Sequence, residues 1–220
     1  MKDENAMTRL IMLPSSRHYA ANSESDPLRF YYFPFFGALY RARVEKCLSL
    51  LPGGKRILEV GFGSGVTFLN LAQLYSEING IDFNADSAAV TECFSKRGVI
   101  AKLVNGSITS APYPDDHFDA VLCISVLEHL KQDELDAACR EIRRVLCPAG
   151  VLVYGVPVDR PLMTASFRLL GYNIHEHHFS TEKDVFAAAK RYLTPDRTEV
   201  IYGLGGLAGP IYETGRLLKK

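Results

Sequence analysis

The chemistry of this chain starts from three glycines at alternate positions. Residues 57–65 read ILEVGFGSG, so Gly61, Gly63 and Gly65 follow a short apolar run that holds one carboxylate. A ligand can lie close to such a turn, because glycine has no Cβ and reaches positive φ freely. The next residues have helical spacing, and a helix start offers N–H donors and partial positive charge. The pattern indicates a nucleotide-like ligand, and the alternative is an ordinary tight turn.

Asp82 supplies a second chemical signal. It ends the next apolar segment, 17 positions after Gly65. Adjacent parallel strands bring this position beside the glycine turn, where a carboxylate can accept both hydroxyls of a ribose. A helix cap or a turn residue is the plainer interpretation of Asp82 alone. Together with the glycines, its spacing favours ribose binding.

Alternating strands and helices must position these residues. The strand patterns cover 56–60, 77–82, 99–104, 118–125 and 151–157. The helical patterns between them cover 38–51, 65–75, a segment from Asn84 or Asp86 to about Gly98, and 133–146. Strand 118–125 is almost wholly apolar, which predicts a central place in the sheet. This rhythm predicts an α/β fold with a parallel, doubly wound sheet.

The last quarter of the chain is less regular. We expect a helix over 182–193 with Thr181 and Asp184 as its cap, and a strand over 198–204. Residues 211–219 fit a strand or a closing helix, and we favour the strand.

Composition limits the class of protein. The chain has 220 residues, 47% of them hydrophobic, and zero formal net charge. It can bury one sizeable core, and its charge balance argues against a broad surface for nucleic-acid backbone. The five cysteines lie scattered through apparently buried segments and no two are spaced as C-x-x-C, which predicts buried, reduced thiols. Their odd number, without a signal sequence, predicts a cytoplasmic protein. We expect neither a secretory signal in residues 1–13 nor a membrane span, which needs ~20 apolar residues.

Four blocks of the sequence resemble one known family. They read ILEVGFGSG, GIDFNAD, GSITSAPYPDDHFDAVLCISVLEHL and EIRRVLCPAGVLVYGVP. Their order and spacing are similar to those of the class I (Rossmann-like) S-adenosylmethionine-dependent methyltransferases, over roughly residues 54–157. The chain most resembles the small-molecule group that includes ubiquinone- and menaquinone-biosynthesis enzymes. The resemblance implies a three-layer sheet of about seven strands with an antiparallel last strand, and S-adenosylmethionine as cofactor without a metal.

The resemblance also implies roles for individual residues. Glu59 would face the methionine end of the cofactor, directly or through water, and the glycines would form the pocket floor. Asp82 would hold the ribose, and Phe83 would pack on the adenine. The implied cofactor-binding set is Glu59, Gly61, Phe62, Gly63, Gly65, Asp82, Phe83, Ser107, Ile108, Cys123 and Ile124.

Two positions qualify these roles. Relatives often carry an acidic residue for the adenine amino group where this chain has Ser107, so we expect its hydroxyl, or the backbone at Ser107 and Ile108, to substitute. Residues 123–125 are implied beside the methionine portion. A nicotinamide fingerprint would need glycine at position 66, where Val66 stands, and this argues against a dehydrogenase.

The acceptor side has weaker signals. Glu128 and His129 follow the fourth predicted strand, and His129 is a candidate general base and substrate contact. The favoured alternative for His129 is a structural hydrogen bond at a helix start. The HEHH run at 175–178 lacks the helical spacing of a metal motif, so we favour a polar loop in which His177 or His178 contacts substrate.

An aromatic cluster at 30–40 has three interpretations. It packs a helix against the sheet, closes over the ligands as a hydrophobic lid, or forms a membrane-surface patch. Tyr19, Tyr31 and Tyr32 are the candidate ligand contacts in and before it, without a choice among them.

The predicted organisation is an arm and one domain. Residues 1–26 form a mobile or loosely docked arm, and 27–220 form a single methyltransferase domain. The domain divides into a front helical and aromatic segment, a cofactor-binding core, and an acceptor-side connection with closing strands, at 27–53, 54–157 and 158–220 respectively.

The sequence thus predicts methyl transfer to a small-molecule acceptor, hydrophobic in part, by direct displacement. A non-catalytic or regulatory protein that binds the same cofactor, and a protein or RNA methyltransferase, remain alternatives. The tetrad N/D-P-P-[YF] of many amino-methylating enzymes is replaced by CISV at 123–126, which argues against amide or adenine nitrogen as acceptor. We expect no nucleic-acid partner, and the oligomeric state is not predicted.

Overall fold

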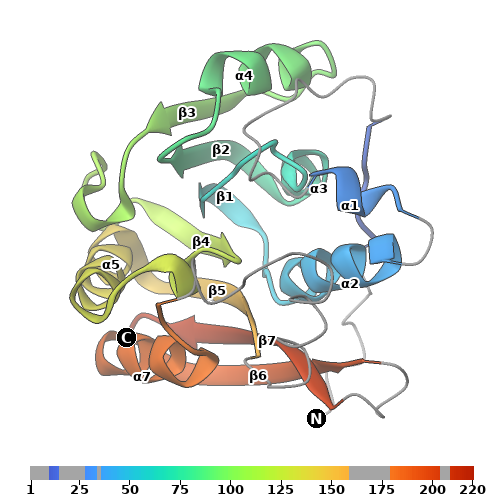
Figure 1. Cartoon of the computed structure of the whole chain (residues 1–220). Helices are drawn as coiled ribbons and strands as arrows, with labels where there is room; N and C mark the ends of the chain where they lie inside the picture. The colour runs from blue at the N-terminus through green and yellow to red at the C-terminus, as the bar shows by residue number, and fades with distance from the viewer. Residues whose placement is uncertain (1–9, 15–27, 34–35, 159–178, 204–208) are drawn as a thin grey trace, which may run out of the picture.

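One mixed sheet organises the protein (Figure 1). The computed structural model describes residues 10–14, 28–33, 36–158, 179–203 and 209–220. Seven strands in these ranges have the order β3-β2-β1-β4-β5-β7-β6, and among them β7 alone runs opposite to the other six. They are β1 (Gly54–Val60), β2 (Tyr75–Asp82), β3 (Ala101–Asn105), β4 (Phe118–Ile124), β5 (Leu146–Pro157), β6 (Thr194–Tyr202) and β7 (Pro210–Leu218). The predicted doubly wound sheet and its antiparallel last strand are confirmed.

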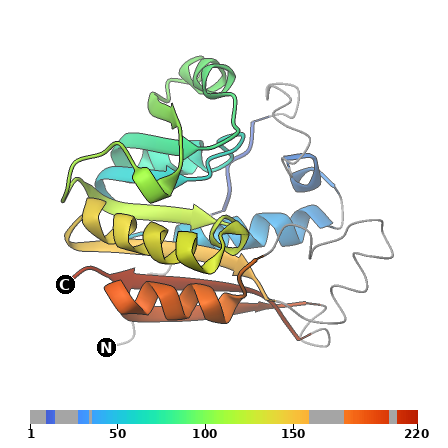
Figure 2. The same ribbon diagram turned by 60° about the vertical axis from the view of Figure 1, so that its left-hand side comes forward.

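Helices cover both faces of this sheet. The described helices are α1 (Leu28–Tyr31), α2 (Phe36–Ser49), α3 (Phe68–Leu74), α4 (Ser87–Ser95), α5 (Gln132–Val145) and α7 (Glu182–Tyr192), with short 3₁₀ turns η2 (Ile108–Ser110) and η3 (Leu127–His129). One apolar core joins α2, α3 and α4 to the sheet, and a second joins α5 and α7 to its other face. Figure 2 shows α5 and α7 side by side across the sheet from α2. The three layers are those expected from the sequence.

The central strand β4 explains why two cores form. Its residues alternate between the faces, so that Ala120 and Leu122 join the first core while Val121 and Cys123 join the second. All four side chains are inaccessible to solvent. A nearly continuous apolar strand is stable only between two helical layers, which is the place predicted for it.

Element boundaries differ from the sequence-based expectations mainly at turns. The helix expected over 65–75 begins only at Phe68, because the preceding residues form the glycine turn. Strand β5 begins at Leu146 instead of residue 151. Of the two candidate caps of α4, Asp86 is the N-cap and accepts a hydrogen bond from the Ala89 N–H, so the Asn84 alternative is wrong. Thr181 caps α7 as expected. Residues 210–218 form a strand, so the closing-helix alternative is wrong.

The described part of the N-terminal arm lies against two helices. The Ile11 N–H donates to Glu45 of α2, and the Met12 N–H donates to Asn70 of α3. The Asn70 amide donates back to the Leu10 carbonyl at 2.8 Å. Residues 10–14 therefore dock across α2 and α3, and the rest of the arm lies outside the described residues.

Candidate functional site

The glycine turn connects β1 to α3 at the carboxyl edge of the sheet. Gly61, Gly63 and Gly65 have φ values of 70°, 48° and 71°, the left-handed region that other residues enter only with strain. A Cβ at Gly61 would collide with the Val126 side chain, and one at Gly65 would lie 2.8 Å from the Phe94 ring. Both backbone conformation and space therefore require glycine here.

The turn lies where the strand order of the sheet reverses, between β1 and β4. Strand β1 pairs with β2 on one side and β4 on the other, so the chain winds outward both ways from this point. Open α/β sheets bind ligands in the crevice outside the carboxyl ends of such strands.

Asp82 ties the turn to the end of β2. Its Oδ2 accepts a hydrogen bond from the Gly63 N–H at 2.9 Å, and its Oδ1 accepts from the N–H groups of Asn84 and Ala85 at 2.8 and 2.9 Å. A carboxylate has about four acceptor positions, so about one remains, on Oδ2. Asp82 thus builds the site, and its free position is compatible with one hydroxyl of a ligand; the prediction that it accepts both ribose hydroxyls stays a prediction.

Glu59 lies beneath the turn as a buried carboxyl group. Only 3% of it is exposed, and it accepts a short hydrogen bond from the Thr67 hydroxyl. Burial raises the pKa of Glu59 to about 8; the Thr67 hydrogen bond opposes this rise, and the negative charge of Asp82 adds to it. Glu59 is therefore a proton-bearing group at neutral pH whose ionisation a nearby cation would favour.

The far end of the site lies between β2 and β3. The Phe83 side chain is 76% exposed there. Phenylalanine side chains are more often buried, so this exposed ring is informative. Ser107 caps η2 by accepting from the Thr109 N–H, and its hydroxyl lies 2.9 Å from that of Thr109. Ile108 is buried in the core below.

Three predicted contact residues have side chains that belong to the core. Phe62 is 2% exposed and packs where a Cβ at Gly80 would meet it at 2.7 Å. Cys123 is inaccessible in the α5-side core, and Ile124 packs against the opposite core. Because the Phe62 and Cys123 side chains are buried, only the backbone at these positions can contact a ligand.

Ser125 follows β4 in a strained conformation. Its φ is 54°, its N–H donates to the Gly155 carbonyl at 2.8 Å, and its hydroxyl lies 3.0 Å from that of Tyr212. Non-glycine residues held in this region gather at functional sites.

Comparison with known proteins gives this geometry a family. Residues 58–154 match the model of a methyltransferase domain family. The chain is 30% identical over 169 residues to a fatty-acid O-methyltransferase of Mycolicibacterium smegmatis, which covers 69% of this chain and 57% of that protein. It is 28% identical over 141 residues to the mitochondrial ubiquinone biosynthesis O-methyltransferase of Schizosaccharomyces pombe, covering 61% of this chain and 47% of that one.

The chain belongs to the class I S-adenosylmethionine-dependent methyltransferases. Its fold is also that of the N-methyltransferase NodS from Bradyrhizobium japonicum WM9, solved with S-adenosyl-L-homocysteine, at a TM-score of 0.65 and 21% identity over 90% of this chain and 93% of that one. The chain spans about half the length of the curated relatives that it matches.

The residues of the site fit the family's cofactor. The glycine turn carries no side chain at Gly61, Gly63 or Gly65, Asp82 keeps about one acceptor position, and Phe83 offers an uncovered apolar ring. S-adenosylmethionine binding is expected of this family, and the individual contacts stay predictions.

Glu128 and His129, which are adjacent on η3, point to different environments. Glu128 is 2% exposed, whereas His129 lies on the exposed side with its N–H donating to the Val126 carbonyl at 3.1 Å. Burial raises the pKa of Glu128 to about 8, while its own backbone N–H and the charge of Arg43 oppose the rise. The carboxyl, not the imidazole, is the inward group, and the role of His129 as a base stays a prediction.

The aromatic segment contributes packing around α2. Tyr31 is 4% exposed, and its ring meets that of Tyr40 edge-on at a centroid distance of 5.7 Å. The Tyr32 hydroxyl donates to the Pro14 carbonyl at 2.5 Å, which holds the docked arm. Core packing is thus part of the cluster's role. Tyr19, His177 and His178 lie outside the described residues.

Two residues beside this site were missed in the sequence. Arg43 of α2 lies with its guanidinium carbon 4.1 Å from the Tyr40 ring centroid and 5.0 Å from that of Tyr212 on β7. The spacing of Arg43 could have indicated that it faces the core. It lies three residues after Tyr40 and four before Cys47, on the apolar side of a predicted helix. The residues around Tyr212 in the sequence gave no sign of a functional role. Tyr212 comes to the site through the pairing of β7 with β5.

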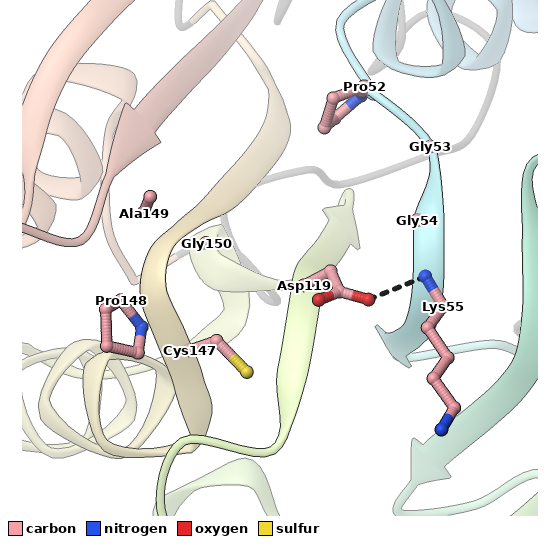
Figure 3. A pocket seen from close by; sticks show the side chains of 9 residues that line it. All are labelled: Pro52, Gly53, Gly54, Lys55, Asp119, Cys147, Pro148, Ala149 and Gly150. Atoms are coloured by element: carbon pink, nitrogen blue, oxygen red, sulfur yellow. Dashed lines mark hydrogen bonds between the residues drawn. The ribbon is translucent and has the colours of Figure 1, made fainter.

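The opposite edge of the sheet has a hollow of about 280 Å³ (Figure 3). It lies between the start of β1 and residues 147–150, where Asp119 accepts a hydrogen bond from the Lys55 N–H at 2.7 Å. This is the amino edge of the strands, away from the glycine turn. Within the described ranges, no three or more His, Cys, Asp or Glu residues gather as a metal site, and no helix is long and apolar enough to span a membrane.

Proposed function

We propose that this chain transfers the methyl group of S-adenosylmethionine to a small-molecule acceptor with an apolar body. The main observation that supports this proposal is that Glu59, the glycine turn and Asp82 meet at the point where the strand order of the sheet reverses. The relatives support an oxygen acceptor as the first class to test, since a fatty-acid and a ubiquinone-biosynthesis enzyme are both O-methyltransferases by name.

Four residues would bind the methyl donor. Glu59 would stabilise the cationic methionine end, Asp82 a ribose hydroxyl, and Phe83 with Ser107 the adenine. When bound, S-adenosylmethionine supplies a methyl group on a positively charged sulfur, from which an acceptor nucleophile can displace it directly. The protein's contribution is then chiefly to hold the acceptor in line and to exclude water.

An apolar acceptor is supported by aromatic surface beside η3. Phe179 is 54% exposed, and its N–H donates to the Glu128 carbonyl at 2.9 Å. The Phe30 and Tyr40 rings stack at 5.2 Å on the side of α2 that carries Arg43. Phe179 thus lies beside the segment after β4, and the stacked rings reach β7 through Arg43, which also lies over Tyr212.

Labelled methyl transfer tests the proposal. The full chain would be incubated with methyl-labelled S-adenosylmethionine and a panel of fatty acids, phenols, amines and thiols, with mass spectrometry of the products. We expect label in at least one oxygen acceptor and formation of S-adenosylhomocysteine. Calorimetry with S-adenosylhomocysteine runs in parallel, and no binding would refute the proposal. Binding without transfer to any small molecule, peptide or RNA would instead support the non-catalytic alternative.

A further inference from the structure

A second polar cluster lies next to the donor side of the site. It consists of Arg43 from α2, Ser125 and Glu128 from the segment after β4, and Tyr212 from β7. Arg43 lies over the Tyr212 ring and interacts electrostatically with Glu128, and the Ser125 and Tyr212 hydroxyls lie 3.0 Å apart. The pairings Val60↔Cys123, Ile124↔Gly155 and Pro157↔Tyr212 carry it along the carboxyl edge directly from the end of β1. The cluster therefore borders the place where an acceptor must meet the donor.

Arg43 carries a positive charge that no ion pair compensates. Its guanidinium is held between the faces of Tyr40 and Tyr212, at 4.1 and 5.0 Å. Its Nε is buried, and no residue in the described part of the chain accepts a hydrogen bond from it. Among the described residues, no carboxylate lies within the 4.0 Å of an ion pair with Arg43. Aromatic faces attract a cation but use none of its N–H donors, so the guanidinium keeps donors for a ligand.

Glu128 forms no ion pair with Arg43 within the described residues. Its Oε2 is buried, and no described residue makes a hydrogen bond to it. Its position is fixed, because its carbonyl accepts from the N–H groups of Phe179 and Ser180 at 2.9 and 3.1 Å. Burial raises the pKa of Glu128 to about 8, and the charge of Arg43 opposes that rise. Within the described residues, Arg43 therefore keeps N–H donors without an acceptor near a buried carboxyl group.

Unsatisfied buried polar groups are rare in folded proteins, and each costs stability unless a ligand meets it. Here a cationic donor and a carboxyl oxygen are both left unmet in one cluster, at the edge where ligands bind. A planar carboxylate suits an arginine fork, because two parallel hydrogen bonds can form. The stacked rings of Phe30 and Tyr40 provide an apolar surface next to it.

We propose that Arg43 binds a carboxylate of the methyl acceptor, with Glu128 and Tyr212 as neighbouring hydrogen-bonding groups. The acceptor is then an organic acid with an apolar body. This inference rests on the proposed function, and it concerns only how the acceptor is recognised. The simpler alternative is that Arg43 braces α2 against β7 through its two rings.

Matched ligands separate these alternatives. Calorimetry on the full chain saturated with S-adenosylhomocysteine would compare decanoate with decanamide and 2-naphthoate with 2-naphthamide. We expect at least one acid to bind ten or more times more tightly than its amide, because the amide keeps the shape and loses the charge. Arg43→Met should abolish this preference, Arg43→Lys should retain part of it, and both should bind S-adenosylhomocysteine within about twofold of the wild type.

Arg140→Met is the control, since Arg140 is an exposed arginine of α5 on the other face of the sheet. It should leave the acid preference unchanged. The inference is overturned if the wild type binds no acid of the panel more tightly than its amide, or if the preference survives Arg43→Met. Should Arg43→Met fail to fold, Arg43→Lys and Tyr212→Phe decide, because a brace predicts that neither changes the acid-to-amide ratio. Failure of the proposed function is distinguishable, since S-adenosylhomocysteine itself would then not bind.

Discussion

At the scale of single residues, the site depends on two carboxyl groups with different tasks. Asp82 is used as an acceptor by three backbone N–H groups, so it holds the loop conformation as well as facing the crevice. Glu59 is buried with one hydroxyl partner and a raised pKa. The first is a structural anion, and the second is a carboxyl group whose charge state depends on what binds beside it.

Replacing Asp82 should affect both ligand binding and stability. Asp82→Ala is expected to weaken S-adenosylhomocysteine binding by about 1–3 kcal/mol and to lower the melting temperature, because three backbone N–H groups lose their acceptor. Calorimetry and thermal unfolding would measure the two effects. Asp86→Ala is the matched control: it removes the α4 cap, so stability should fall by about 0.5–2 kcal/mol with unchanged ligand affinity. Unchanged affinity in Asp82→Ala would show that Asp82 does not contact the ligand.

The raised pKa of Glu59 makes ligand binding depend on pH. Below a pKa of about 8 the free protein holds Glu59 mostly protonated, whereas a bound ammonium group favours the carboxylate. Affinity for S-adenosylhomocysteine should therefore rise with pH by up to about tenfold per unit and level off above about pH 8. Glu59→Gln should remove most of this slope, as measured by calorimetry across the range. An equal slope in both proteins would contradict the assignment.

The same shift has a consequence for stability without ligand. The native pKa of Glu59 lies above its unfolded value of about 4.3, so the native state binds more protons between these values. The free energy of unfolding should consequently fall as pH rises from about 5 to 8, and Glu59→Gln should flatten that part of the curve. Urea unfolding of both proteins across this pH range would measure the difference.

At the scale of elements, the β1–α3 turn is the feature that sequence and structure describe in the same way. Its glycines are needed for two separate reasons, positive φ and lack of space. Gly98, which ends the turn after α4, has a similar φ of 75°, but no atom lies within 4 Å of the place that a Cβ would take. The two positions therefore separate backbone strain from steric contact.

Alanine at Gly61 and at Gly98 should have unequal effects. Gly98→Ala is expected to cost about 1–2 kcal/mol of unfolding free energy, from backbone conformation alone. Gly61→Ala should cost about 1–3 kcal/mol more, because its Cβ meets Val126, and should also weaken S-adenosylhomocysteine binding. Urea unfolding and calorimetry would measure both. Val126→Ala in the Gly61→Ala background should restore part of the loss, and equal losses at the two glycines would contradict the steric argument.

At the scale of the whole molecule, the two edges of the sheet have different tasks. The carboxyl edge carries the glycine turn, Asp82 and the Arg43 cluster. The amino edge is closed by Lys219, which is 9% exposed and whose ammonium group donates to Asp116 and to the Leu146 carbonyl, each at 2.6 Å. Lys219 thereby joins the end of β7 to the starts of β4 and β5, far along the chain.

Lys219→Met should destabilise the fold without affecting the site. We expect a loss of about 1–3 kcal/mol in unfolding free energy, because the buried Leu146 carbonyl loses a charged donor. Lys220→Met, at an exposed position, should stay within about 0.5 kcal/mol of the wild type. Urea unfolding would test the difference, and S-adenosylhomocysteine affinity should be unchanged in both. A loss of affinity in Lys219→Met would mean that the two edges are coupled.

The donor side of the site was predictable because its signals are local. The glycines, Glu59 and Asp82 lie within two adjacent strand ends, and each strand's pattern places its own carboxyl end. The acceptor side was not, since Arg43 and Tyr212 are 169 positions apart and meet only through the strand order β5-β7. Helical periodicity also could not say that Glu128, rather than His129, is the inward residue, because η3 is a short 3₁₀ turn instead of a regular helix.

The sequence by itself determined the doubly wound fold, the glycine turn and the family, because these depend on residue type and spacing within short segments. Only the tertiary structure decided that Asp82 already serves three backbone donors and that Glu59 is buried with a raised pKa. It also decided that Arg43, which has no ion-pair partner among the described residues, lies over Tyr212 near the carboxyl edge. Burial and pairing depend on which distant segments come together, and hydrogen bonds and charges respond to that environment rather than to their neighbours in the chain.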